Sequence, residues 1–238
     1  MRAAARAAFI DLTVSLEGGY INWMFPDVKG LVSTGFGLLL DPVELALALP
    51  WRRIDGLRVT ADEIRADFAR VKTYPDAPRL GHLSVRGVAQ LRLALEDLDH
   101  AVEAKIRSNE SILRSAFAEY DDWSADAQLG VHSMAWAVGP AFQRGWPKFT
   151  AALRAKDFET ASVECFMPEE KKIGGLRPRN HANRILFRNA AFALANRLDP
   201  DELFYPRDMQ AETPAPDSVI VVDQPIVHPR VPLGRDDE

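Results

Sequence analysis

Residues 17–37 read EGGYINWMFPDVKGLVSTGFG, and this stretch decides the fold of the chain. Upstream, apolar residues recur at spacings of three and four, which predicts a first helix of about four turns. These apolar residues are Ala5, Phe9, Leu12 and Leu16. Gly18 and Gly19 then end the helix where a left-handed cap is favoured. The β-branched and aromatic residues of 31–40 predict a strand that enters a hairpin.

Two acidic side chains flank the loop after this helix. Glu17 falls in the last helical turn, where unpaired carbonyls disfavour ionisation and raise the pKa of a carboxyl group. A carboxyl that keeps its proton near neutral pH can act as a general acid. Asp27 follows Pro26 on a turn, where a solvated aspartate stays ionised and can orient or deprotonate water. The alternative for Asp27 is a structural role, in which its side chain stabilises the turn.

Two hydroxyl groups follow on the predicted strand. Ser33 and Thr34 are adjacent, so their side chains point to opposite faces and only one can share a face with Asp27. The register relative to Gly35 and Gly37 favours Ser33, and Thr34 remains the alternative.

Three blocks of sequence occur in order over most of residues 5–195. The first contains Glu17, Asp27, Ser33, Gly35 and Gly37; the second covers residues 123–129 and 133–139; the third combines Gly174, Gly175, Leu176 and Arg179 with residues 185–187. Together they resemble the phage-type lysozymes, the muramidases of glycoside hydrolase family 24. That family carries a glutamate ending its first helix, then an aspartate, then a threonine before a Gly-x-Gly. The second and third blocks resemble its buried central helix and its closing Gly-Leu-x-x-Arg helix.

The sequence departs from this family pattern in three ways. The spacing between the two acids is one residue longer, and the extra residue falls in loop 19–26, where added length costs little. Ser33 replaces the threonine, which keeps the hydroxyl group but loses the methyl group that fixes its rotamer. Ala137 stands where the family often carries asparagine or glutamine. These departures bear on activity and substrate more than on fold.

The resemblance implies an α+β, lysozyme-like fold that is mostly helical, with a small antiparallel β lobe at about residues 18–40 of a catalytic domain 1–200. It implies hydrolysis of the β-1,4 bond between N-acetylmuramic acid and N-acetylglucosamine, without a cofactor or a metal. Glu17 would be the acid, Asp27 would position or deprotonate water, and Ser33 would help to hold that water. Direct attack by water would invert the anomeric centre, which requires carboxyl groups about 6.5 to 9.5 Å apart.

Other functions on the same architecture stay open. One is a chitinase or a lytic transglycosylase, because Ser33 and Ala137 can reflect a different subsite or a reaction without water. Another is a catalytically inactive, lysozyme-shaped protein that binds the cell wall or serves as a phage-tail or secretion component.

Composition favours one monomeric enzyme-sized domain. The chain has 238 residues, of which 47% are apolar, enough for one sizeable core. Cys165 is the single cysteine and lies in an apolar helical stretch, so we expect a buried thiol and no disulfide within the chain. The five histidines are scattered and no Cys/His group has zinc spacing, so no metal site is expected.

The charge pattern points to one basic segment. The net charge is −5, but six basic residues occur without an acid between them: Lys171, Lys172, Arg177, Arg179, Arg184 and Arg188. We interpret this run as a cleft wall for glycan or peptide carboxylates, with Arg177 and Arg179 binding substrate; the alternative is a solvated helix face. The low pI and the lack of an aromatic platform disfavour nucleic-acid binding. Trp23, between the two acids, is the aromatic side chain expected nearest to sugar rings.

The beginning of the sequence reads as a helix of the fold rather than a signal peptide, because Asp11 interrupts the apolar stretch. No window has the length of a membrane span, so no membrane insertion is expected. A muramidase made this way in a bacterial or phage-infected cytoplasm would reach the periplasm and cell wall through a holin, a phage tail or a secretion machine. It would act there as an endolysin or an antibacterial effector, for which an immunity protein is a further candidate partner.

Further elements follow from local signals. Asp41 and Pro42 favour the start of a short helix through Leu49, and Thr60 with Glu63 forms a capping box. Residues 74–82 read as a loop, and apolar residues from Ser84 onward predict one long helix that links a small lobe to a larger one; they are Val88, Leu91, Leu95, Leu98, Val102 and Ile106. Residues 206–238 read as a proline-rich tail, extended or disordered, with an apolar run at 219–222.

Overall fold

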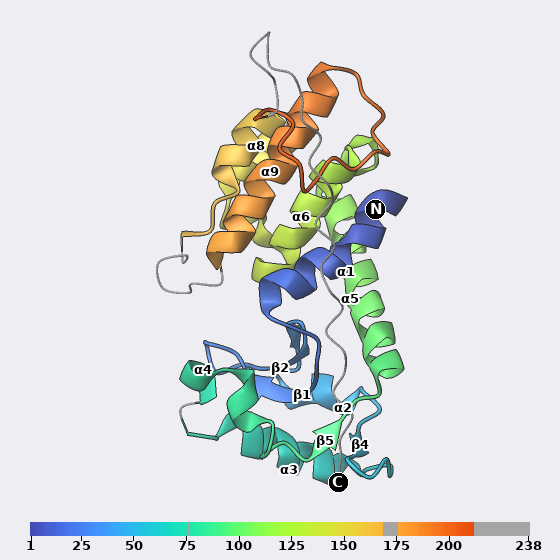
Figure 1. Cartoon of the computed structure of the whole chain (residues 1–238), viewed down its shortest axis with the longest axis vertical. Helices are drawn as coiled ribbons and strands as arrows, with labels where there is room; N and C mark the ends of the chain where they lie inside the picture. Colours follow the sequence, from blue (N-terminus) through green and yellow to red (C-terminus); the bar gives the residue numbers. More distant parts are fainter. Residues whose placement is uncertain (76, 169–175, 212–238) are drawn as a thin grey trace, which may run out of the picture.

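The computed structural model describes residues 1–75, 77–168 and 176–211, which form an α+β fold that is mostly helical with small antiparallel sheets. The helices are α1 (Ala3–Glu17), α2 (Val43–Leu47), α3 (Ala61–Lys72), α4 (Ala77–Leu80), α5 (Leu95–Ala116), α6 (Ala125–Val138), α7 (Pro147–Arg154), α8 (Phe158–Glu164) and α9 (Leu176–Ala195). The strands are β1 (Ile21–Pro26), β2 (Val32–Gly35), β3 (Leu38–Leu39), β4 (Arg52–Arg53) and β5 (Leu91–Arg92). Figure 1 shows the sheets and α2–α4 in one lobe, the small lobe, and α6–α9 in the other, the helical lobe, with α5 alongside both.

Helix α1 ends as its sequence predicts. Gly18 caps it in the left-handed conformation, at a φ of 81°, which glycine adopts without steric cost. The predicted apolar stripe is buried at Ala5, Phe9 and Leu12. Glu17 is therefore the last residue of the helix, directly before the chain enters the sheet.

The three-stranded sheet has the order β1-β2-β3, and both pairings are antiparallel. Phe25 pairs with Ser33, and Ser33 pairs with Leu39, so these three side chains lie on one face. Thr34 lies on the opposite face, as expected for adjacent residues of a strand. A bulge between Ile21 and Phe25 interrupts the first pairing.

The small lobe confirms one helix start and changes two predicted elements. Thr60 and Glu63 form the capping box at the start of α3. Pro42, and not Asp41, is the N-cap of α2, and the Asp41 carboxylate accepts a hydrogen bond from Lys72 at 2.5 Å instead. The predicted loop at residues 74–82 was wrong in part, since it contains the short helix α4 and leads into a 3-10 helix, His82–Val85.

The predicted long helix was wrong at its start. Helix α5 begins at Leu95 rather than Ser84, and β5 lies in between. Leu91 pairs with Arg53 of β4, while the backbone N–H of Leu93 donates to the carbonyl of Asn22 at 2.9 Å. Tertiary pairing with two strands thus overrides an apolar spacing that is compatible with a helix.

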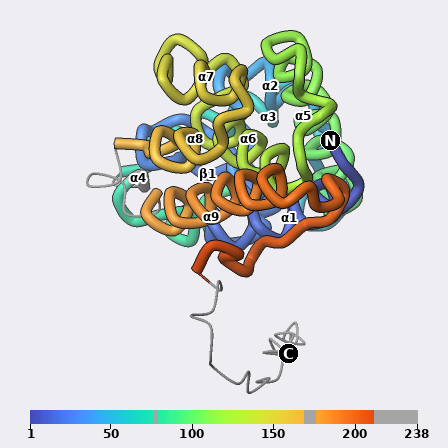
Figure 2. Tube along the Cα trace, turned by 90° about the horizontal axis from the view of Figure 1, so that it is seen from above, coloured from blue at the N-terminus to red at the C-terminus, as the bar shows by residue number. Residues whose placement is uncertain are grey.

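Helix α6 is the centre of the helical lobe. It begins after Ser124, whose side chain caps it, and its residues from Ala125 to Ala135 are buried. Helices α1, α5 and α9 pack against it, and Figure 2 shows α6 among them from above. A Cβ on Gly130 would lie 2.9 Å from the ring of Phe187, so the α6–α9 packing leaves room for glycine alone there.

The described part of the chain after α9 packs on the helical lobe. The buried carboxylate of Asp126 accepts hydrogen bonds from the backbone N–H groups of Phe204 and Tyr205, both at 3.0 Å. The Asn189 side chain bonds to the backbone of Arg207 and Met209. The predicted tail starts within this segment, and its residues 212–238, including the apolar run 219–222, lie outside the described residues.

Candidate functional site

Glu17 meets a buried arginine where α1, α6 and α9 converge. Arg179 of α9 is 1% exposed, and its Nη2 donates to Glu17 Oε1. Its Nη1 donates to the carbonyl and the Oγ of Ser133 on α6, at 3.1 and 3.0 Å. Because the contacts with Ser133 fix the guanidinium group of Arg179, its hydrogen bond holds one carboxylate oxygen of Glu17 in place.

Burial changes the ionisation of Glu17. Desolvation raises the pKa of its carboxyl group, and the charge and hydrogen bond of Arg179 oppose that rise without cancelling it. The position of Glu17 at the C-terminal end of α1 favours the same direction. The side chain is still 31% exposed, so it remains in contact with solvent.

The Gly-x-Gly turn after β2 lies against the other oxygen of Glu17. A Cβ placed on Gly37 would be 3.7 Å from Glu17 Oε2 and 3.3 Å from Trp136 Nε1. Gly37 has a φ of 99°, which disfavours any other residue. Trp136 of α6 donates from Nε1 to the carbonyl of Phe36 at 2.9 Å, which fixes the turn beside Glu17.

Asp27 adopts the turn-stabilising role that its sequence position allowed. Its Oδ1 accepts the backbone N–H groups of Lys29 and Leu31, each at 2.8 Å. The backbone of Asp27 also bonds to the carbonyl of Leu31, which closes the β1–β2 hairpin. Within the described part of the chain, the turn contacts of the Asp27 side chain are made by Oδ1 and not by Oδ2.

The sheet register separates the two candidate hydroxyl groups. Thr34 is fully buried, and its Oγ1 donates to the carbonyl of Ile21 at 3.1 Å. Ser33 lies on the other face, with Phe25 and the exposed Leu39, and is itself buried, at 4% exposure. Asp27 lies just beyond β1, two residues after Phe25, which is the strand partner of Ser33, and this favours Ser33 over Thr34 as its partner.

The side chains expected to bind substrate lie in different surroundings. Trp23 is partly buried, donates to the carbonyl of His82 at 3.3 Å, and has two guanidinium groups over its ring. Arg177 is exposed in the first turn of α9. Arg179 is buried and serves Glu17, so it is not part of an exposed cleft wall.

The other residues of the predicted basic run also differ in their surroundings. Arg184 is exposed, whereas Arg188 pairs with Asp208 at 2.7 Å. Lys171 and Lys172 lie outside the described residues. The run is therefore not one continuous charged surface over the described part of α9.

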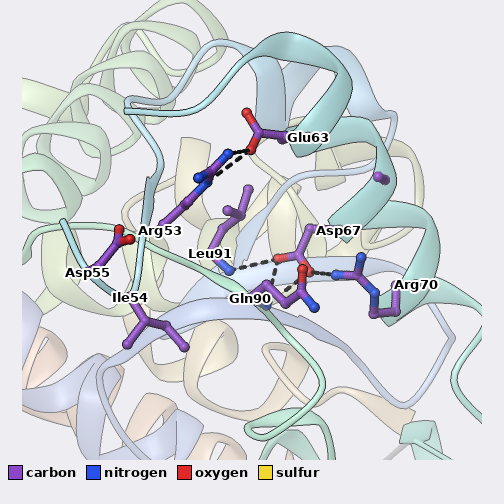
Figure 3. A pocket seen from close by; sticks show the side chains of 9 residues that line it. Arg53, Ile54, Asp55, Glu63, Asp67, Arg70, Gln90 and Leu91 are labelled. Carbon is purple, nitrogen blue, oxygen red and sulfur yellow. Dashed lines mark hydrogen bonds and ion pairs between the residues drawn. The ribbon is translucent and has the colours of Figure 1, made fainter. Parts of the chain in front are cut away.

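A pocket of about 490 Å³ lies elsewhere, between α3 and the β4–β5 ribbon. Its charged side chains pair with one another: Arg53 with Glu63, and Asp67 with Arg70 (Figure 3). The backbone N–H groups of Gln90 and Leu91 also donate to Asp67. Neither Glu17 nor Asp27 lines this pocket.

Sequence reasoning missed the pairing of Glu17 with Arg179, and it missed Ser133, which holds Arg179 rather than Glu17. Arg179 stands in the Gly-Leu-x-x-Arg motif, but its pairing with Glu17 joins residues 162 positions apart and no local pattern signals it. Ser133 belongs to the second sequence block and gave no separate signal. Trp136, expected in the core, contributes its indole N–H to the turn beside Glu17.

In residues 1–75, 77–168 and 176–211, no group of three His, Cys, Asp or Glu side chains is placed to hold a metal ion. Over the same residues, no helix has the length and apolar character needed to cross a bilayer. Comparisons with protein-family models, with curated proteins and with solved structures find no match to this chain.

Proposed function

We propose that this chain is a lysozyme-like peptidoglycan hydrolase, a muramidase that cleaves the β-1,4 bond between N-acetylmuramic acid and N-acetylglucosamine. Glu17 donates the proton to the leaving-group oxygen, and Asp27 orients or deprotonates the attacking water, which Ser33 helps to hold. The glycan strands of the cell wall are its substrate, reached as a phage endolysin or as a secreted antibacterial effector.

The observation that carries this proposal is the setting of Glu17. A general acid needs a raised pKa, a fixed orientation and access to substrate at the same time. Burial raises the pKa of Glu17, Arg179 holds Oε1, and the side chain remains 31% exposed. Oε2, on the side of Gly37, is then the oxygen that carries the transferred proton.

The hairpin geometry supports a complementary role for Asp27. Its turn contacts use Oδ1 and leave Oδ2 to accept a hydrogen bond from water. An inverting reaction requires about 6.5 to 9.5 Å between the two carboxyl groups, which leaves room for that water. The products should then be reducing sugars of inverted anomeric configuration.

The test is clearance of a peptidoglycan suspension, followed by mass analysis of the fragments. We expect activity in the parent chain and a loss of at least about 100-fold in Glu17→Gln and in Asp27→Asn. Matched controls are Glu44→Gln and Asp11→Asn, which change exposed carboxylates on other parts of the surface and should keep full activity. Fragments heavier by one water indicate hydrolysis, whereas anhydro sugars would indicate a lytic transglycosylase.

One observation favours a second candidate, a lysozyme-shaped protein that binds the cell wall without cleaving it. The ion pair with Arg179 stabilises the ionised form of Glu17, which cannot donate a proton. For such a protein, the parent chain and Glu17→Gln would clear cell walls equally poorly and would both sediment with them. A chitinase would instead degrade chitin in preference to peptidoglycan.

A further inference from the structure

The indole of Trp23 is flanked by two arginines, Arg86 and Arg92, that belong to no sequence motif. The guanidinium carbons of Arg86 and Arg92 lie 5.6 and 5.4 Å from the ring centroid. Arg92 also donates to the carbonyls of Ala89 and Leu91, both at 2.8 Å, and to that of Arg86 at 2.9 Å. The backbone and the indole together therefore hold Arg92 in one orientation.

These two positive charges are not neutralised locally. Among the described residues, no carboxylate forms an ion pair with Arg86 or Arg92, and Arg86 is exposed. Asp67 is close enough to act on Arg92 electrostatically, but its carboxylate bonds to Arg70 and to the backbone of Gln90. The pKa of Arg92 is lowered, first by burial and also by Arg86. Like charges held together in this way favour a bound anion.

The arginines lie beside the sheet face that carries Ser33. The His82 ring lies 6.3 Å from the ring of Trp23 and 5.9 Å from that of Phe25. Phe25 pairs with Ser33 in the sheet, so His82 connects the arginine cluster to that face. Trp23 follows Glu17 by six positions. Six extended residues span at most about 20 Å, so the backbones of Trp23 and Glu17 lie within that distance of each other.

We propose that Arg86 and Arg92 bind the free carboxylates of the peptide stems attached to the glycan strand. This inference rests on the proposed muramidase function and names the part of the substrate that the small lobe recognises. Guanidinium groups match the planar geometry of carboxylates, and Trp23 orients the pair rather than stacking on a sugar. Because the chain carries a net charge of −5, attraction of an anionic polymer requires a local cationic site such as this one.

The test measures binding in the Glu17→Gln background, so that hydrolysis does not remove the ligand. Three soluble ligands are compared: peptide-bearing glycan fragments, the same fragments with amidated carboxyl groups, and fragments stripped of peptide that keep only the lactyl carboxylate. We expect the first to bind about tenfold or more tightly than the others, the range given by a charged hydrogen bond. Arg86→Gln should abolish this preference. Arg144→Gln, which changes another exposed arginine, should retain it.

Equal affinity for all three ligands, no binding of any of them, or an unchanged preference in Arg86→Gln would overturn the proposal. Tight binding of the stripped fragments would also overturn it, since it would assign the site to the lactyl group. Arg86 is the variant of choice because its exposed side chain leaves the carbonyl contacts of Arg92 intact. Clearance of cell walls by the parent chain is scored separately. Selective binding without clearance would refute the muramidase and keep the carboxylate site.

Discussion

At the scale of single residues, the ion pair between Glu17 and Arg179 sets the pH range of the proposed reaction. Arg179 lowers the pKa of Glu17, against the larger rise caused by burial. Removing the guanidinium in Arg179→Gln leaves burial unopposed, so Glu17 should keep its proton to higher pH. The basic limb of the pH profile of kcat/KM should then shift upward.

Arg179→Lys is the matched control for this shift, because it keeps the positive charge while losing the contact geometry. Its basic limb should lie between those of the parent chain and Arg179→Gln. A titration of the Glu17 carboxyl group by NMR provides a readout that does not require activity. A downward shift in Arg179→Gln would contradict the electrostatic role assigned to Arg179.

Gly37 gives a second prediction at this scale, which separates the effect of backbone strain from the effect of contact with Trp136 and Glu17. Gly37→Ala places a methyl group 3.3 Å from Trp136 Nε1 and 3.7 Å from the carboxyl of Glu17, at a φ of 99°. Gly56→Ala is the control, because its φ is 84° and no atom lies within 4 Å of its Cβ. Both should lose roughly 1–2 kcal/mol of unfolding free energy through backbone strain. Only Gly37→Ala should also lose activity, measured by wall clearance at a temperature where both remain folded.

At the scale of elements, the buried start of α6 holds the segment that follows α9. Asp126 accepts two backbone N–H groups of that segment and the side-chain N–H of Asn189. Asp126→Ala leaves these buried donors unpaired and should cost about 2–4 kcal/mol of unfolding free energy. Asp157→Ala, which removes an exposed N-cap of α8, should cost only about 1 kcal/mol.

Amide hydrogen exchange distinguishes the loss of these Asp126 hydrogen bonds from a general loss of stability. In Asp126→Ala, the amides of Phe204 and Tyr205 should exchange faster than those of the α6 core, because their acceptor is gone. In Asp157→Ala, both groups of amides should change together or not at all. Equal protection of residues 204 and 205 in the parent chain and Asp126→Ala would show that other contacts hold the segment.

Elements were predictable from sequence where a local signal and the tertiary structure agree. The end of α1 at Gly18 and the start of α3 at Thr60 each depend on side chains within a few residues. The stretch before α5 was not predictable, because Leu91 has helical spacing but pairs with Arg53. For the candidate site, local signals were enough to predict that Glu17 ends α1 and that Ser33 and Thr34 lie on opposite faces of the sheet. The burial of Arg179 depends on the packing of three helices and has no local signature.

At the scale of the whole molecule, the two buried clusters share the same helices. The first cluster joins the sheet and α1–α3 to Leu98 of α5 and Leu186 of α9. The second contains Leu113 of α5 and Phe187 of α9. Because α5, α6 and α9 contribute to both, the small lobe should not unfold independently of the helical lobe, although Figure 1 shows them as distinct.

The corresponding prediction compares two substitutions on one helix. Leu98 and Leu113 are both fully buried in α5, one in each cluster. Leu98→Ala and Leu113→Ala should each lower the free energy of unfolding by about 2–5 kcal/mol within a single transition. Unfolding can be followed by far-ultraviolet circular dichroism and by the fluorescence of chains that retain only Trp51 or only Trp123, which report on different clusters. The unfolding curves from these three probes should coincide. If Leu98→Ala moved the Trp51 curve alone, the lobes would be separate folding units, and the contact of the Gly-x-Gly turn with Glu17 would vary independently of α9.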